Sequence, residues 1–155
     1  MKKFFFDSGV RDPLASTGLL VMRVSFGLMM LIGHGIVKWK NYGEMVKGWD
    51  IVPQIWPLSH MSGSMSLMST IGAEVFASAL IVLGLATRPA AFVLGFAMCV
   101  AAFQVHGGDP TFSMGGPSKE MALLYLIPAF VLIITGAGQW SLDALIHSDK
   151  RRRRR

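Results

Sequence analysis

The chain has 155 residues, of which 52% are hydrophobic and 15% are charged, and its formal net charge is +6. Because an ordinary soluble domain has roughly 25% charged residues, this composition favours an integral membrane protein. Nucleic-acid binding by a soluble basic domain is excluded, since the basic charge is concentrated in a terminal run over residues 150–155 and no recognition motif accompanies it.

The first long apolar stretch, Leu14–Val37, carries Arg23 near its middle and His34 near its end. Its 24 residues suffice for a helix that crosses a bilayer, which takes about 20 residues. An arginine in hydrocarbon costs roughly 2.5–3.5 kcal/mol, so we expect Arg23 to face protein or a water-filled cavity. Arg23 and His34 are eleven positions apart, which places them about 20° apart around the helix.

Three further apolar spans follow a polar and aromatic interval, Lys38–Ser64. They cover approximately Met65–Ala86, Pro89–Val105 and Met121–Gly138. The second and third spans are separated only by a short turn, which predicts a tight antiparallel hairpin. The sequence therefore predicts an all-α integral membrane fold, a four-helix transmembrane bundle with up-down-up-down topology. In this interpretation residues 1–150 form a single domain and residues 151–155 form a basic tail.

The distribution of lysine and arginine predicts the orientation of the bundle. Ten of these residues lie at the termini and in the turn at Arg88, whereas four lie on the opposite side: Lys38, Lys40, Lys47 and Lys119. Because positively charged segments tend to stay inside, we expect both termini to be cytoplasmic. The arginine tail is expected either to meet anionic lipid headgroups or to be a solvated end.

Depth counted from the ends of the spans places Arg23 and Glu74 near the middle of the membrane. Two lone charges there would each be costly, whereas a pair offsets much of the desolvation. We therefore predict a buried Arg23–Glu74 ion pair. Thr70 and Ser78 share a face with Glu74, because they lie four residues on either side of it. Whether the pair takes part in function or only clamps two helices stays open.

A second polar set at the outer ends of the spans predicts a lined cavity. With the ion pair, the candidate substrate-binding residues are Arg23, His34, Lys38, Glu74, His106 and Glu120. Ordinary alternatives exist, since a histidine at a helix end is commonly an interface residue and Glu120 suits the start of a helix. No catalytic residue is assigned, and no metal site is predicted. The single cysteine, Cys99, excludes a CxxC thiol relay and four-cysteine iron–sulfur ligation.

Several short motifs follow one another along the chain. The first span has Arg23 and then the pair His34-Gly35, the second has Glu74, and the third ends at His106. The turn reads GLATR over 84–88, the fourth span opens with EMALLYL over 120–126, and GQWSLD follows over 138–143. In order and spacing these motifs resemble the DoxX family of small four-helix bacterial membrane proteins, over roughly Leu14–Ile146.

The DoxX resemblance implies a multi-pass protein of the bacterial inner (plasma) membrane. Related proteins include the membrane subunit of thiosulfate:quinone oxidoreductase and members of a membrane oxidoreductase complex linked to oxidative stress. We therefore expect a membrane subunit of an oxidoreductase system that binds a quinone or a small redox substrate in the polar cavity. In this hypothesis Arg23 and Glu74 act on a quinone carbonyl, and His34 and His106 relay protons. Whether the chain is an enzyme by itself stays open.

Other functions fit the same residues. The chain could be a non-catalytic membrane anchor or assembly partner, or a small proton or anion conduit. Haem held by His34 and His106 is disfavoured because no supporting hydrogen-bonded shell is identifiable. We expect no cofactor in the chain itself apart from a bound quinone. The expected partners are the lipid bilayer, a soluble or membrane redox subunit and a second copy of the chain, without nucleic acid.

Overall fold

The first apolar span is a continuous helix from Pro13 to Lys40 in the computed structural model, which describes residues 8–10 and 12–146. Its start is capped by the Asp12 carboxylate, which accepts a hydrogen bond from the Ala15 amide at 2.7 Å. Proline suits this first turn, where no amide donor is needed. The span comprises α2 (Pro13–Met30), a π-helical turn η1 (Leu31–Gly35) and α3 (Ile36–Lys40).

The rest of the chain supplies three more helical spans. After the short elements α4 (Tyr42–Met45), η2 (Val46–Gly48) and η3 (Leu58–His60), the second span comprises α5 (Gly63–Gly72), η4 (Ala73–Ala77) and α6 (Ser78–Leu83). The third comprises α7 (Thr87–Val100) and η5 (Ala101–Val105), and the fourth is α8 (Glu120–Thr135). Three spans are long and apolar enough to cross a membrane, and the fourth is an apolar helix of 16 residues.

The second span ends at Leu83 because Gly84 adopts a left-handed backbone conformation, with φ of 67°. The amides of Gly84 and Leu85 turn back to the carbonyl oxygens of Ile81 and Leu80, each at 3.0 Å. This pattern terminates a helix and is favoured by glycine, which has no Cβ to clash. The span therefore ends three residues before the predicted Ala86, it begins at Gly63 and not at Met65, and the turn to α7 is tight, as predicted.

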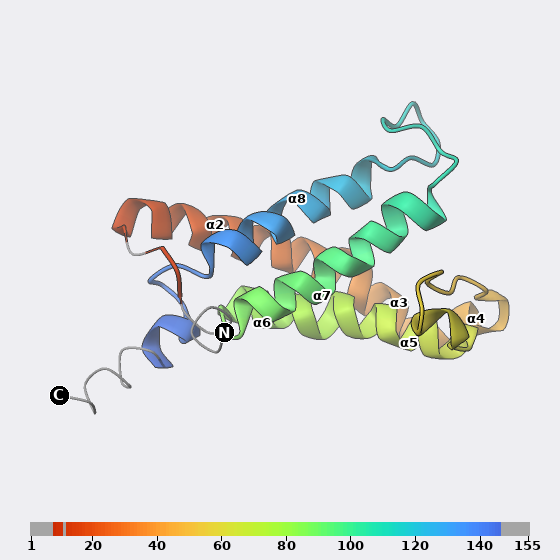
Figure 1. Ribbon diagram of the computed structural model, residues 1–155, viewed down its shortest axis with the longest axis horizontal. Coiled ribbons are helices and arrows are strands. Elements are labelled where there is room, and N and C mark those ends of the chain that lie inside the picture. Colours follow the sequence, from red (N-terminus) through yellow and green to blue (C-terminus); the bar gives the residue numbers. More distant parts are fainter. Residues whose placement is uncertain (1–7, 11, 147–155) are drawn as a thin grey trace.

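The four spans lie side by side, and their connections alternate between two ends of the bundle (Figure 1). One end, called the turn end here, holds the α6–α7 turn and residues 136–146. The other, called the loop end, holds the connections 41–62 and 106–119. The first span packs on the second and fourth, and the third packs on the second and fourth. An all-helical bundle is thus confirmed, and its orientation in a membrane stays a prediction.

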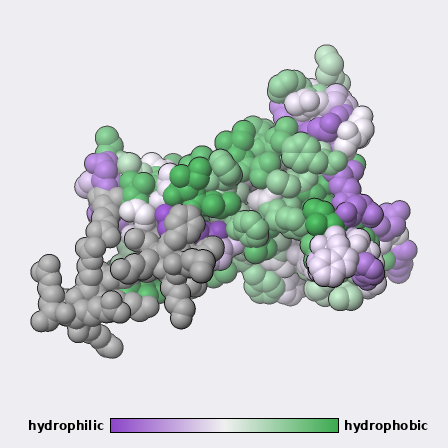
Figure 2. Space-filling view, viewed as in Figure 1, coloured by the Kyte–Doolittle hydropathy of each residue, from purple (hydrophilic) through white to green (hydrophobic). Residues whose placement is uncertain are grey.

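Small residues let the third and fourth spans pack closely. Ala90, Ala91 and Ala129 are at most 4% exposed, and a Cβ added at Gly95 would lie 3.5 Å from that of Ala129. Small residues at helix contacts are typical of membrane bundles, where van der Waals packing drives association. On the face that Figure 2 shows, side chains are mostly apolar over the middle of the bundle and more polar toward the loop end. This surface fits a bilayer.

A π-helical turn lies within each of the first two spans, and a third one ends the third span. The turns are η1, η4 and η5, and η1 contacts η4. A π-turn inserts one extra residue into the helix, which rotates the side chains that follow it and commonly marks a functional site. Here the first turn carries His34, the second carries Glu74 and the third carries Gln104. The fold therefore places three polar side chains at irregular turns, with His34 and Gln104 near the loop end and Glu74 near the middle of the second span.

Candidate functional site

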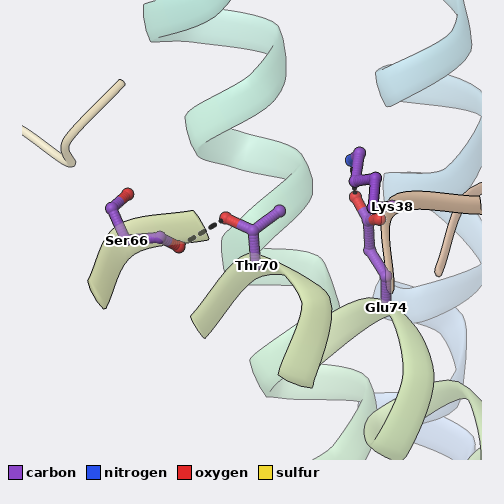
Figure 3. Close-up of polar contacts among 4 residues, drawn as sticks. All are labelled: Lys38, Ser66, Thr70 and Glu74. Carbon is purple, nitrogen blue, oxygen red and sulfur yellow. Dashed lines mark hydrogen bonds and ion pairs between the residues drawn. The ribbon is translucent and has the colours of Figure 1, made fainter. Parts of the chain in front are cut away.

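Lys38 and Glu74 form an ion pair between the first and second spans (Figure 3). The Lys38 ammonium donates to Oε1 of Glu74, and the two side chains are 24% and 3% exposed. The other carboxylate oxygen, Oε2, is buried and has no hydrogen-bond partner within the described residues. A buried polar atom without a partner is costly and calls for an explanation. This oxygen is the first indication of a binding site.

Gly35 allows the first span to approach the backbone of Glu74. A Cβ at Gly35 would lie 2.8 Å from the Glu74 carbonyl oxygen and 2.8 Å from a methyl group of Val75. Both segments are π-helical turns, so the irregular parts of two helices face each other. The small residue after His34 therefore has a packing role, and it fixes which residues of the two spans share a level.

His34 lies against an aromatic residue of the fourth span. Its ring meets that of Tyr125 edge to face, with the centroids 5.4 Å apart and the planes at 84°. Tyr125 is 7% exposed, also packs on Phe26 at 5.8 Å, and lies within electrostatic range of Glu74. Sequence reasoning missed Tyr125. The signal was available, since it is a hydroxyl-bearing side chain inside an apolar span.

Arg23 lies at a different level and bonds to backbone oxygens. One guanidinium nitrogen donates to the carbonyls of Ile81, at 3.1 Å, and Val82, and the other donates to the carbonyl of Trp140. The side chain is only 2% exposed. The carbonyls of Ile81 and Val82 belong to the last turn of α6, where a helix leaves unpaired acceptors and a partial negative charge. Arg23 therefore caps the second span.

The predicted Arg23–Glu74 ion pair is wrong. Glu74 is seven to eight residues from the carbonyls that Arg23 reaches, which is about 11 Å along the helix at 1.5 Å per residue. The contacts of Gly27 with Ser78 and of Gly35 with Glu74 set the offset between the spans. The prediction placed Arg23 and Glu74 at the same depth because each lies nine residues from the start of its predicted span. That count ignores the offset between two helices of 28 and 21 residues.

Asp143 completes the turn end and was also missed. Its two carboxylate oxygens accept from the amides of Ala86, at 2.8 Å, and Thr87, at 3.0 Å, at the start of α7. The carboxylate is 4% exposed and lies within electrostatic range of Arg23. A carboxylate at the start of a helix is favourable. The GLATR and GQWSLD motifs therefore meet in one structural cluster.

Arg88 gives the fourth span a similar cap. Its Nε donates to the carbonyl of Ile133 at 3.0 Å, and a second guanidinium nitrogen donates to that of Ile134 at 3.2 Å. These oxygens lie in the last turn of α8. Two arginines thus stabilise the ends of the second and fourth spans, which gives both guanidinium groups a structural role at the turn end.

Replacing Gly84 by alanine is expected to destabilise the fold by about 2 kcal/mol. A Cβ there would lie 2.7 Å from Nη1 of Arg23 and 2.6 Å from Cβ of Ser141, at a φ of +67°. Gly18→Ala is the matched control, because a Cβ at Gly18 meets no atom within 4 Å. The control is expected to be neutral or slightly stabilising. Unfolding by SDS titration in mixed micelles measures the stability of both variants. Equal unfolding midpoints for Gly84→Ala and Gly18→Ala would contradict the close packing of Arg23 on Gly84.

The structure does not bring His106 and Glu120 into contact with the Lys38–Glu74 pair. Nδ1 of His106 lies 2.7 Å from a carboxylate oxygen of Asp109, and both side chains are about one-third exposed. Oε2 of Glu120 accepts from the Ser113 amide at 2.8 Å. Each of these two candidates is thus bonded within the connection after the third span. Of the predicted cavity residues, Lys38 and Glu74 contact each other, and His34 lies one helical turn before Lys38. The polar cavity itself stays a prediction.

A shallow apolar hollow of about 350 Å³ lies at the turn end. It is lined by Leu83, Gln139, Trp140, Ser141, Leu142 and Leu145. None of the predicted site residues lines it, although Trp140 supplies a carbonyl to Arg23. The predicted cavity was placed at the other end of the bundle, so this hollow is not that site.

Residues 18–107 match the model of the DoxX family, which is more than half of the chain. The chain belongs to the DoxX family. A Haemophilus influenzae protein that is 26% identical over 132 residues covers 85% of each chain. A second protein of that organism is 39% identical over 72 residues, which is 45% of this chain and 54% of the relative. Both are named only as uncharacterized proteins. No solved structure matches the chain.

The DoxX match includes Lys38 and Glu74 and ends just after the third span. Arg23, His34 and the whole connection between the first and second spans also lie inside it. Tyr125 and Asp143 lie beyond it, on the fourth span and after it. The ion pair, the arginine cap and the π-turns are thus features of the DoxX part of the chain. The basic tail, 151–155, lies outside the described residues.

Proposed function

We propose that this DoxX protein is a membrane subunit of an oxidoreductase system of the bacterial plasma membrane, and that it binds a quinone headgroup or a similar small redox substrate beside Lys38 and Glu74. The observation that carries the proposal is the buried Glu74 oxygen without a partner, next to an ammonium group. A quinone supplies two-electron, two-proton chemistry when it is bound. Arg23 is removed from the expected site, since both of its terminal guanidinium nitrogens donate to carbonyls at the turn end, at a different level from Glu74.

Donors and acceptors at the pair suit such a headgroup. The Lys38 ammonium has three donors, of which one is used by Glu74, so it can also bond a carbonyl oxygen. Oε2 of Glu74 accepts only, so it suits a hydroxyl. His34 lies one helical turn before Lys38 and packs against Tyr125 of the fourth span, so a titratable ring and a hydroxyl-bearing side chain are available near the pair. Intramembrane ionisable residues commonly mark such sites.

A conduit across the bundle is less well supported than a one-sided site. On the second span, residues 75–80 between Glu74 and the carbonyls that Arg23 reaches carry no Asp, Glu, His or Lys, and on the first span His34 is the one such side chain between Arg23 and Lys38. Arg23 itself places a fixed positive charge at the turn end, which opposes the passage of protons and other cations. A proton that reaches Glu74 would therefore return to the loop end. A non-catalytic anchor, in which the ion pair only joins two spans, is the alternative outcome of the test.

The test measures equilibrium binding of a short-chain ubiquinone to the purified protein in nanodiscs. Glu74→Gln and Lys38→Met are each expected to weaken binding about tenfold or more, since each removes a charged hydrogen-bonding group. Glu120→Gln and Lys47→Met make the same chemical changes outside the pair and are expected to leave binding unchanged. If neither site variant alters binding while both remain folded, the site assignment fails. If the unaltered protein binds no quinone and shows no redox activity, the anchor is favoured.

A further inference from the structure

Four polar side chains form a row along the otherwise apolar second span. They recur every four residues, at Ser66, Thr70, Glu74 and Ser78, which places them on one face of a helix. Ser66 and Glu74 are each 3% exposed, and Ser78 is fully buried. Thr70 donates to the carbonyl of Ser66 at 3.0 Å, and in Figure 3 it lies between Ser66 and Glu74. The row leads from the loop end to the ion pair.

The residues 49–54, called the strap here, lie against the outer end of this row. The Ser66 hydroxyl donates to the carbonyl of Ile51, and the Trp49 indole donates to the same oxygen at 3.0 Å. The strap also contacts the start of α5, since a Cβ at Gly63 would lie 2.1 Å from the Trp49 carbonyl oxygen. Ile51 therefore covers the first member of the row.

Gln104 ties the strap to the third span. Its side-chain nitrogen donates to the carbonyl of Val52 at 2.6 Å, and its side-chain oxygen accepts from the amide of Gln54 at 2.9 Å. One amide side chain thus pairs with two backbone groups of the strap, as a neighbouring strand would. Gln104 lies in the π-helical turn η5, whose extra residue sets the direction of its side chain.

We propose that the strap is a gate over the Glu74 site, with Gln104 as its latch. The proposal rests on the function proposed above for Glu74, and it adds how substrate or protons reach that residue. The strap is held to the second and third spans by the side chains of Ser66 and Gln104, so it can open without unfolding a helix. Opening uncovers Ser66, and Thr70 then leads to Glu74. Access is from the loop end only.

The experiment introduces a thiol into the row with Thr70→Cys, in a Cys99→Ala background, and follows its labelling by a membrane-impermeant maleimide in nanodiscs. Adding Gln104→Leu is expected to raise the labelling rate on the order of tenfold, the factor that one or two hydrogen bonds supply. Hydrogen exchange at the Gln54 amide, which donates to Gln104, is expected to accelerate as well. Gln139→Leu, the same change at the turn end, is expected to alter neither rate.

Faster exchange at Gln54 with unchanged labelling would show that the strap opens without uncovering the row, and would overturn the gate. Unchanged exchange in Gln104→Leu would overturn the latch. Gln104→Glu keeps the acceptor for the Gln54 amide and loses the donor to the Val52 carbonyl, so its labelling and exchange rates are expected to be intermediate. This variant provides a second test in case Gln104→Leu does not fold. If the gate variants behave as expected but Glu74→Gln leaves quinone binding unchanged, the gate stands and the proposed function fails.

Discussion

Arg23→Leu is expected to lower the free energy of unfolding by roughly 4 kcal/mol, because three buried or partly buried carbonyl groups lose a charged donor, at about 1–3 kcal/mol each. Those groups belong to the last turn of α6 and to Trp140, so the loss separates the second span from the chain after the fourth. SDS titration in mixed micelles gives the measurement. The stability of Arg23→Lys is expected to lie between those of the unaltered protein and Arg23→Leu, since an ammonium group cannot reach the same set of carbonyls as the planar guanidinium group.

The control for this substitution is Lys40→Leu, a basic side chain on the same helical span that is exposed. It is expected to change stability by less than about 0.5 kcal/mol. Quinone binding by folded Arg23→Lys is expected to match the unaltered protein, because Arg23 caps a helix away from Glu74. A stable Arg23→Leu variant that has lost binding would instead return Arg23 to the functional site.

Lys38→Met is expected to lower the free energy of unfolding by about 3 kcal/mol, because it leaves a carboxylate buried without its countercharge. Adding Glu74→Gln removes that charge and should recover most of the loss, which gives a large coupling in a double-mutant cycle. Glu44 and Lys47 provide the matched cycle, since they form an exposed pair with side chains 83% and 69% exposed. Their coupling is expected to be about 0.5 kcal/mol or less. Equal couplings in the two cycles would contradict a buried pair.

The helical fold follows from features that are local in the sequence. Apolar runs of sufficient length predict the spans, and the Asp12-Pro13 start and the Gly84 stop follow from capping chemistry. The level at which two helices face each other is a property of their packing. Here Gly27 and Gly35, eight residues apart on the first span, set that level by admitting the backbone of the second span. Their spacing was visible, but their partners were not.

The candidate site was predictable only in part for the same reason. Glu74 stood out as a charge in an apolar span, and Lys38 as a base one turn beyond His34. Their pairing depends on the offset between the two helices, which the sequence does not show, and so Glu74 was predicted to pair with Arg23 instead. Tyr125 and Asp143 gain their significance from neighbours that are distant in sequence. The π-helical turns at His34 and Glu74 have no signature in composition or periodicity.

The central claim is that the partner of Glu74 is Lys38, and one chemical measurement separates the two pairings. A carbodiimide that enters membranes converts a carboxylate to an O-acylisourea. A lysine amine that has lost its proton at contact distance then displaces the urea and forms an amide, so the joined peptides weigh one water less than their sum. Arginine forms no such amide under these conditions. Peptide mass spectrometry is expected to find Lys38 joined to Glu74, and to find no such product in Lys38→Met. Activated Glu74 that stays unlinked to Lys38 in the folded protein would contradict the account.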